Sequence, residues 1–398
     1  MAISFVSPSG EVSIQDDLWH VASSSNSGQT DFKYVFDIYY KGQQLIRTKV
    51  FPEPTNGKGY FNASQVVRNE ITYDWFQPTL GTSIRQNQPS ISGEISLTYD
   101  VRVGEDFSGV TTLNLASGQT TAYNWIPQLY KRRKFNFSNY GNKFLTNRPL
   151  NNLRGSLDDR IYIPFKMSSD SNHFVIKGYN QSNQLLLGTT TYFFRDPITN
   201  PFFQLDIGAR NVNAFLAGIP YTTLDYSMYY YEISFLYNTD EKVRVYLDCS
   251  KKYNPISLHF INAFGMFESA KFQLVSKLSL DVERKTFAKR DYSFNGNSVD
   301  YYDANNVYNE SSINYGSKID WKYKLTMNYP TDAEYEWLAE LMISPQIYAE
   351  IDDNFYPVSI INTNYEYSKN VNNGLRALEI DIAMNQTRYG FRRWQDYL

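Results

Sequence analysis

Short β-type runs, each followed by turn-forming residues, constrain this chain more than any other feature. Runs rich in Tyr, Phe, Val, Ile and Thr alternate with Asn- and Gly-containing links through most of the 398 residues. Such residues suit pleated, half-buried strands, and Asn and Gly suit the turns between them. No fixed period of self-similarity is evident, which disfavours solenoids and propellers. The pattern predicts an all-β chain.

Individual segments give more specific predictions. Residues 32–40 and 45–51 are two β-type runs on either side of a short Gly-containing link, so they predict a hairpin. Residues 94–103 alternate apolar and polar side chains, as a half-buried strand does. Residues 136–152 and 295–314 are rich in Asn and are expected to form long loops.

One short helix is expected near the C-terminus, at about 331–343. Thr331 and Glu334 have the spacing of a capping box, in which each side chain bonds the backbone amide of the other residue. The residues that follow place four apolar side chains on one helix face, namely Trp337, Leu338, Leu341 and Met342. Pro345 then ends the helix, because proline disfavours the helical conformation in the residue before it.

The length suggests two or three domains, because a domain has about 100–200 residues. We expect two to three antiparallel β-sandwich or barrel domains. The expected divisions are an N-terminal β-sandwich at 1–110, a central β domain with an Asn-rich loop at 111–246, and a C-terminal β-sandwich with the helix and a docking tail at 247–398.

Composition excludes several classes. Aromatic residues make up 17% of the chain, which disfavours disorder. The mean hydropathy is −0.48 and no run approaches about 20 apolar residues, so no membrane span is expected. The net charge of −3 gives no basic field for a specific nucleic-acid partner. Residues 1–10 lack the features of a signal peptide, and a single cysteine, Cys249, fits synthesis in a reducing cytosol.

The sequence contains few residues or motifs that indicate a catalytic, cofactor-binding or metal-binding site. His20, His173 and His259 lie far apart and each has a strand-like context, and Cys249 has no accompanying nucleophile motif. The sequence contains no metal-ligand spacing, no phosphate-binding glycine loop and no G-x-S-x-G motif. We therefore expect no catalytic, cofactor or metal site and no enzymatic activity. A glycan hydrolase that uses an acid pair is a weaker alternative.

Two basic and aromatic clusters are candidate protein interfaces. One contains Lys131, Arg132 and Arg133, and the other contains Arg388, Tyr389, Phe391, Arg392, Arg393 and Trp394. Trp and Arg are favoured anchors of protein interfaces, so residues 388–398 are interpreted as a docking tail. The 34 tyrosines also suit recognition, since Tyr offers a large amphipathic contact area at low entropy cost.

Five segments carry a resemblance to a known family, namely 51–62, 247–269, 283–287, 337–345 and 356–359. They resemble segments of the virion structural proteins of tailed bacteriophages, especially phages of Bacteroidota hosts. The resemblance implies a tail, baseplate or connector component that acts by assembly and has no catalytic residue. Its partners would be other copies of itself and other virion structural proteins. It would assemble in the host cytoplasm and reside in the virion.

A ring-forming subunit makes head-to-tail contacts that close by rotation, with an interface above about 2,000 Å² in total per neighbour. Two alternatives remain open at this stage. One is a carbohydrate- or receptor-binding virion protein, whose partner would be a host surface glycan. The other is a minor structural protein associated with the capsid or collar.

Overall fold

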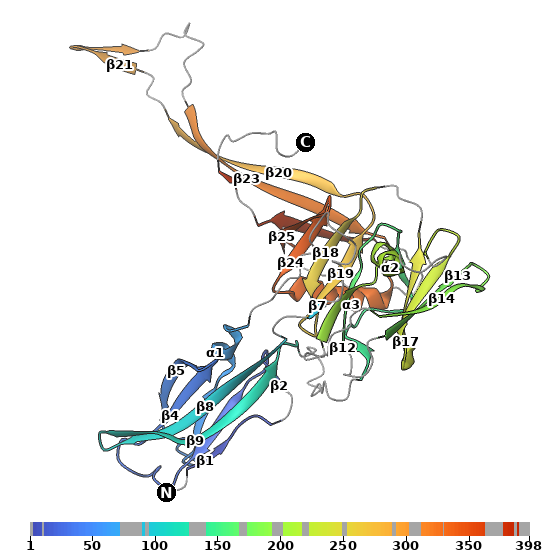
Figure 1. The fold of residues 1–398 in the computed structure, drawn as a ribbon. Helices are drawn as coiled ribbons and strands as arrows, with labels where there is room; N and C mark the ends of the chain where they lie inside the picture. Colours follow the sequence, from blue (N-terminus) through green and yellow to red (C-terminus); the bar gives the residue numbers. More distant parts are fainter. Residues whose placement is uncertain are drawn as a thin grey trace. The chain divides into compact units, whose positions relative to one another are not determined.

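The structure is a computed structural model that describes residues 3–9, 12–71, 90–91, 95–126, 141–166, 173–192, 202–216, 223–248, 253–288, 292–301, 312–328, 330–362, 377–385 and 388–389. Strands in mainly antiparallel sheets dominate these residues, which confirms the all-β prediction (Figure 1). The chain divides into two compact units. Unit 1 contains residues 1–250, 259–270 and 336–345, and unit 2 contains residues 251–258, 271–335 and 346–398.

Unit 1 begins with a β-sandwich of two sheets. The first has the strand order β1-β3-β6, formed by β1 (Ser4–Val6), β3 (Trp19–Ser23) and β6 (Gly59–Asn62). The second has the order β2-β9-β8-β4-β5, formed by β2 (Val12–Ser13), β4 (Lys33–Tyr40), β5 (Gln43–Val50), β8 (Ser96–Phe107) and β9 (Val110–Tyr123). The predicted hairpin is β4–β5 and the predicted strand is β8. Helix α1 (Ser64–Arg68) follows β6.

The inward residues of the two sheets form one apolar core. Phe36 of β4 stacks on Phe61 of β6 with ring centroids 5.5 Å apart, so the core joins one sheet to the other. Tyr34 and Tyr99 are completely buried in the same core. Burial of aromatic side chains contributes strongly to the stability of such a core, because each removes a large apolar area from water.

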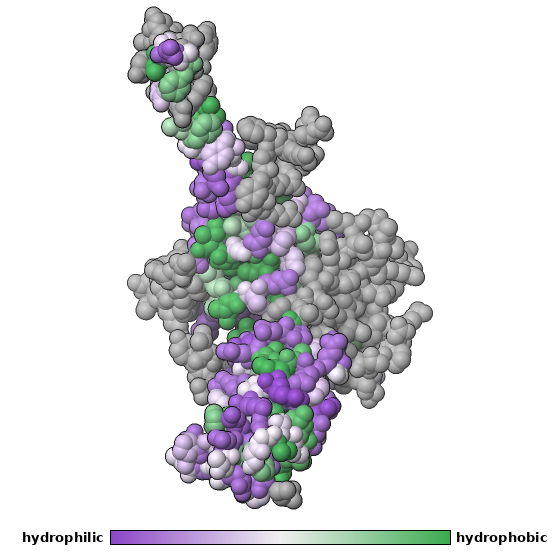
Figure 2. Space-filling model, turned by 90° about the vertical axis from the view of Figure 1, so that its left-hand side faces the viewer, coloured by the Kyte–Doolittle hydropathy of each residue, from purple (hydrophilic) through white to green (hydrophobic). Residues whose placement is uncertain are grey.

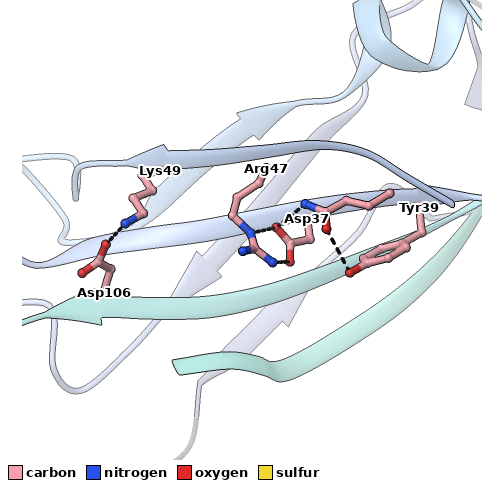
Figure 3. Close-up of polar contacts among 6 residues, drawn as sticks. Asp37, Tyr39, Arg47, Lys49 and Asp106 are labelled. Carbon is pink, nitrogen blue, oxygen red and sulfur yellow. Dashed lines mark hydrogen bonds and ion pairs between the residues drawn. The ribbon is translucent and has the colours of Figure 1, made fainter. Parts of the chain in front are cut away.

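The second sheet also carries polar pairs between its strands (Figure 3). Arg47 donates from Nε and Nη2 to the two carboxylate oxygens of Asp37, at 2.7 and 2.8 Å, and Lys49 pairs with Asp106. The hydroxyl group of Tyr39 belongs to the same row of contacts. Asp37 and Arg47 lie opposite each other on adjacent strands, where opposite charges stabilise a sheet modestly, so this pair reinforces the β4–β5 hairpin. Lys49 of β5 and Asp106 of β8 pair across β4.

The rest of unit 1 contains two more sheets. One has the order β10-β12-β15-β7, formed by β7 (Ser90–Ile91), β10 (Lys143–Phe144), β12 (Tyr162–Lys166) and β15 (Phe202–Asp206). The other has the order β11-β17-β16-β13-β14, formed by β11 (Leu153–Gly155), β13 (His173–Tyr179), β14 (Leu185–Tyr192), β16 (Tyr230–Phe235) and β17 (Asn238–Leu247).

These two sheets share an aromatic core. Phe165 of β12 contacts Phe203 of β15 and Phe174 of β13, with ring centroids 5.4 and 5.2 Å apart. Helix α2 (Ala209–Leu216) adds Val212 and Leu216 to this core. The sequence pattern did not predict α2.

Strands β18 (Ile256–Ile261) and β19 (Phe267–Phe272) are neighbours in their sheet and are joined by a tight turn. Gly265 in this turn has φ +79°, and a Cβ atom there would lie 1.6 Å from the backbone oxygen of Asn124. Only glycine fits such a position, because it tolerates positive φ and has no Cβ. The turn therefore lies directly against the end of the N-terminal sandwich.

Helix α3 (Asp332–Ile343) confirms the one predicted helix. The capping box forms as expected: the Thr331 amide donates to Glu334 Oε2 at 2.8 Å, and the Glu334 amide donates to Thr331 Oγ1 at 3.3 Å. Trp337, Leu338 and Leu341 are buried, and Met342 is half-buried.

Unit 2 contains a sheet with the order β24-β25-β26-β23-β20, and β27 also pairs with β23. Its strands are β20 (Lys277–Ala288), β23 (Ser312–Met327), β24 (Ile347–Ile351), β25 (Asn354–Ile360), β26 (Leu378–Met384) and β27 (Arg388–Tyr389). A separate hairpin pairs β21 (Tyr292–Asn295) with β22 (Ser298–Tyr301).

Two expected loops contain strands. The segment 136–152 contains β10, and its residues 136–140 lie outside the described residues. The segment 295–314 contains β22 and the start of β23, so its assignment as a loop is wrong there, whereas 302–311 are not described. The reason is local: Gly296 and Asn297 form a hairpin turn between β21 and β22, and Gly296 supplies the positive φ of +61° that such a turn uses.

The expected domain boundaries stay a prediction. Val110, at the first boundary, is the first residue of β9, which pairs with β8. Segments 259–270 and 336–345, expected in the C-terminal domain, cluster with unit 1. No helix in the described part of the chain is long and apolar enough to cross a membrane.

Candidate functional site

Unit 2 contains a long two-stranded ribbon, in which one strand is almost wholly exposed and the other is mostly half-buried. Strands β20 and β23 pair antiparallel over twelve residues of β20, from Lys277 opposite Lys324 to Ala288 opposite Ser312. Strand β26 pairs only with the Lys322–Met327 end of β23, and β20 is the last strand in the sheet order. Most of β20 is exposed, and β20 and β23 run together as a long pair of strands (Figure 1).

One face of the ribbon is apolar. Residues directly opposite each other in an antiparallel pair share a face, and faces alternate along each strand. The register places Leu278 opposite Tyr323, Leu280 opposite Trp321 and Val282 opposite Ile319, all on one face. Leu278 is 52% exposed and Val282 is 43% exposed. We call these six residues the apolar stripe.

The opposite face is charged. It contains Lys277, Lys318, Lys322 and Lys324 together with Asp281, Glu283 and Asp320. Lys322 pairs with Asp281, and Lys318 Nζ lies 2.9 Å from Asp320 Oδ2. All of these ion-pairing side chains are at least one-third exposed, so each pair contributes little stability. The ribbon is therefore amphipathic across its thickness.

Apolar exposure continues beyond a bulge between Lys285 and Thr286. Phe287 lies opposite Ile313, and its ring centroid is 6.0 Å from that of Tyr315; Phe287 is 48% exposed and Tyr315 is 65% exposed. In the β21–β22 hairpin, Phe294 lies opposite Val299, and both are exposed. Figure 2 shows green apolar residues at the surface of the projecting hairpins at the top of the view.

The predicted docking tail begins on this ribbon. Strand β27 places Arg388 opposite Ile319 and Tyr389 opposite Lys318 of β23. The side chains of these two residues lie outside the description. The other predicted interface residues lie outside the described residues altogether: Phe391, Arg392, Arg393, Trp394, Lys131, Arg132 and Arg133. The pairing of the ribbon was not predicted, because it joins strands from two separate segments of the chain. Its residues 312–314 also fall in the segment 295–314, whose Asn-rich composition indicated a loop.

The histidines do not converge. His20 Nε2 lies 2.9 Å from Tyr99 Oη in the N-terminal core, where burial lowers the pKa of His20 to about 4. His259 Nδ1 lies 3.1 Å from Ser269 Oγ in the interior of unit 1. The side chain of His173 and all of Cys249 lie outside the description. Among the residues described, no group of three or more His, Cys, Asp or Glu side chains is placed to hold a metal ion.

A buried carboxyl cluster in unit 1 was missed by the sequence analysis. Glu268 of β19 is completely buried and accepts hydrogen bonds from Thr146 Oγ1 at 2.6 Å and Asn262 Nδ2 at 3.0 Å. Glu340 of α3 is 8% exposed. It accepts hydrogen bonds from Asn147 Nδ2 at 2.6 Å and the Ala263 amide at 2.7 Å.

Burial is the main cause of the pKa shifts of the two carboxyl groups in this cluster. Burial, followed by the charge of Glu268, raises the pKa of Glu340 to about 7. Burial also raises the pKa of Glu268, although its hydrogen bonds and the charge of Arg148 oppose the shift. Arg148 donates to the backbone oxygen of Ser269 at 2.9 Å, and its guanidinium group lies 4.6 Å from the ring centre of Trp337. The enclosed cluster joins three distant segments and presents no group to a substrate.

A pattern in the sequence pointed to Glu340. It follows Trp337 by three residues, so it lies on the same helix face as the predicted apolar side chains. A glutamate on that face needs buried hydrogen-bond partners.

Comparison of the sequence with models of protein families and with curated proteins finds no match to either.

Proposed function

We propose that the chain is a non-enzymatic structural subunit of a tailed-phage virion, in a tail, baseplate or connector, and that copies of it form a ring. It would assemble in the host cytoplasm and act without a cofactor. The virion context comes from the sequence resemblance. The observation that carries the assembly role is the exposed, amphipathic β20–β23 ribbon. A position at the collar or on the capsid would use the same assembly chemistry.

Such a ribbon is expected to need a partner surface. A two-stranded hairpin is at best marginally stable alone in water. Of the 21 exposed large apolar side chains described, seven lie between Val275 and Tyr315. Contiguous apolar exposure of this kind marks interaction sites, and β20 also offers an unpaired strand edge.

The charge of the ribbon favours a second copy of the same chain as the partner that covers it. Strands β20 and β23 contain six Lys or Arg and three Asp or Glu, a net charge of +3. The whole chain carries −3, so the rest of it carries −6. A ribbon placed on another ribbon would bring like charges together, whereas a ribbon on the acidic remainder is attracted. This asymmetry favours a heterologous contact, the type that closes into rings.

The dimensions are adequate for a stable contact. Twelve paired residues at about 3.3 Å each span roughly 40 Å, and two strands are about 10 Å wide. Each face is then roughly 400 Å², so covering both faces buries roughly 800 Å² on this subunit, about the share of one partner in a standard interface. Contacts from β21–β22 and from residues 388–398 would enlarge it.

Light scattering over a concentration series tests the proposal. We expect a defined oligomer, and we expect Leu278→Asp to shift it towards monomer, because a carboxylate in the apolar stripe would be buried without a partner. Leu185→Asp is the matched control, since Leu185 is 56% exposed in a different sheet.

A strict monomer at every concentration would contradict the assembly role. So would an oligomer that survives Leu278→Asp but not Leu185→Asp, because the interface would then lie away from the ribbon.

A further inference from the structure

We propose that a tyrosine-lined cleft in unit 1 binds a short, uncharged glycan. The cleft has a volume of about 700 Å³. Small-molecule sites have volumes of about 300–1,000 Å³. Its lining includes Tyr226, Tyr229, Tyr246, Asn152, Arg154 and Asp248. The cleft belongs to the sheet that contains β11, β16 and β17, so it is separate from the ribbon.

Backbone hydrogen bonds hold the walls of the cleft in place. The Leu247 amide donates to the Tyr229 backbone oxygen at 3.0 Å, and the Tyr229 amide donates to the Tyr179 backbone oxygen at 2.7 Å. Arg154 of β11 lies opposite Tyr246 of β17 in a parallel pair. Side chains on such a fixed frame need little ordering when a ligand binds.

The aromatic wall is rigid at its base and open at its surface. The Tyr229 and Tyr246 rings pack edge to face with centroids 5.4 Å apart, and Tyr246 packs against Tyr230 at 5.5 Å. Tyr230 in turn stacks on Tyr179 at 4.9 Å. Tyr229 nevertheless remains 47% exposed. The cluster therefore holds an exposed ring in a defined orientation.

The neighbouring Tyr226 is also half exposed and is placed by a turn. Tyr226 is 50% exposed, and it lies between Asp225 and Ser227. The Ser227 amide donates to Asp225 Oδ1 at 2.8 Å, which fixes this turn. Two exposed tyrosines thus line one opening.

This combination suits a sugar. The negative face of an aromatic ring attracts the C–H groups of a pyranose. Asn152 and Gln181 each offer an amide that both donates and accepts, which matches hydroxyl groups. The charged lining residues are one arginine and one aspartate, so the lining has no excess of positive charge to select a phosphate. A wholly apolar ligand is disfavoured because half of the ten lining residues are polar or charged, namely Asn152, Arg154, Gln181, Ser227 and Asp248.

The test is an array of neutral oligosaccharides, followed by calorimetric titration of the full chain with each glycan that binds. We expect at least one glycan to bind, and we expect Tyr229→Ala to weaken that binding at least tenfold. Tyr237→Ala is the matched control, because Tyr237 is 72% exposed and is not part of the cleft lining. Thermal melting of each variant verifies that it is folded.

Two outcomes would overturn the proposal: no glycan on the array binds, or binding persists unchanged in both Tyr229→Ala and Tyr226→Ala. Binding of inorganic phosphate without any glycan would also overturn it, because the cleft would then be an anion site. The titration does not depend on oligomeric state. A failure here therefore leaves the proposed assembly role standing, and a strict monomer that binds glycan leaves this inference standing.

Discussion

Glu340 should make the stability of unit 1 depend on pH. Its pKa is about 7 in the folded chain, against an ordinary value of 4.5. A carboxyl group whose pKa is raised by folding binds more protons in the folded state. The stability that this carboxyl group contributes is therefore fully present at a pH below its pKa in the unfolded chain. It is lost as the pH rises through about 7, the pKa of the group in the folded chain. We expect the free energy of unfolding, measured by chemical denaturation, to fall between about pH 5 and pH 8 by on the order of 3 kcal/mol.

The variant Glu340→Gln isolates this effect. Its amide is neutral at every pH, and Asn147 can turn its own amide to remain hydrogen-bonded to it. The decline between about pH 5 and pH 8 should therefore shrink. Glu336→Gln is the control, because Glu336 is exposed on the same helix. A pH dependence that is as steep in Glu340→Gln as in the parent chain would show that the carboxyl group titrates normally.

The burial of Glu340 illustrates how far single residues could be predicted. The helix pattern correctly indicated that Trp337, Leu338 and Leu341 face the interior. It did not indicate how Glu340 on that face is satisfied, because Asn147, which donates to its carboxyl group, is 193 positions away in the sequence. Local patterns identify which face is buried, but not which distant polar groups meet there.

At the scale of elements, the start of α3 should depend on its capping box. Thr331→Ala removes the hydroxyl group that accepts from the Glu334 amide, so one backbone donor of the first turn loses its partner. We expect a loss of about 1 kcal/mol in the free energy of unfolding. Chemical denaturation followed by circular dichroism measures it.

Glu334→Gln is the matched variant for this box. Glutamine retains an oxygen that can accept from the Thr331 amide, so it should cost less than Thr331→Ala. Equal losses in the two variants would mean that the charge of Glu334 at the helix N-terminus matters more than the box itself.

Other elements were predictable to different degrees. Hairpin β4–β5 and strand β8 followed from alternation and turn residues, both of which are local signals. Helix α2 was missed because it is short and contains two asparagines, which favour turns over helix interiors. Most of β23 carries alternating residues, but its first residues lie in an Asn- and Tyr-rich stretch that indicated a loop.

At the scale of the whole molecule, strand content was predictable but pairing was not. Strand β11 pairs with β17, about 90 residues further along the chain. Residues 259–270 and 336–345 belong to unit 1, although unit 2 residues precede and follow both segments. Loop closures of this length leave no local signature, because their energetic cost depends only weakly on length.

Charge distribution is a property of the whole chain, and it predicts how assembly responds to salt. The positive ribbon and the negative remainder attract each other through water, and salt screens such attraction over a Debye length of about 10 Å at 0.1 M. We expect the dissociation constant of the oligomer, measured by sedimentation, to rise at least about tenfold between about 50 and 500 mM NaCl, because long-range attraction speeds association mainly at low salt.

Two triple variants with the same total charge separate the ribbon from a general charge effect. In the first, three lysines of β23 become alanine, namely Lys318, Lys322 and Lys324. In the second, three exposed lysines of the N-terminal sandwich become alanine, namely Lys41, Lys49 and Lys58. The first should weaken assembly at low salt and flatten its salt dependence, whereas the second should leave both unchanged. If the two variants behave alike, net charge alone governs association and the ribbon does not contact the acidic part of a neighbouring copy.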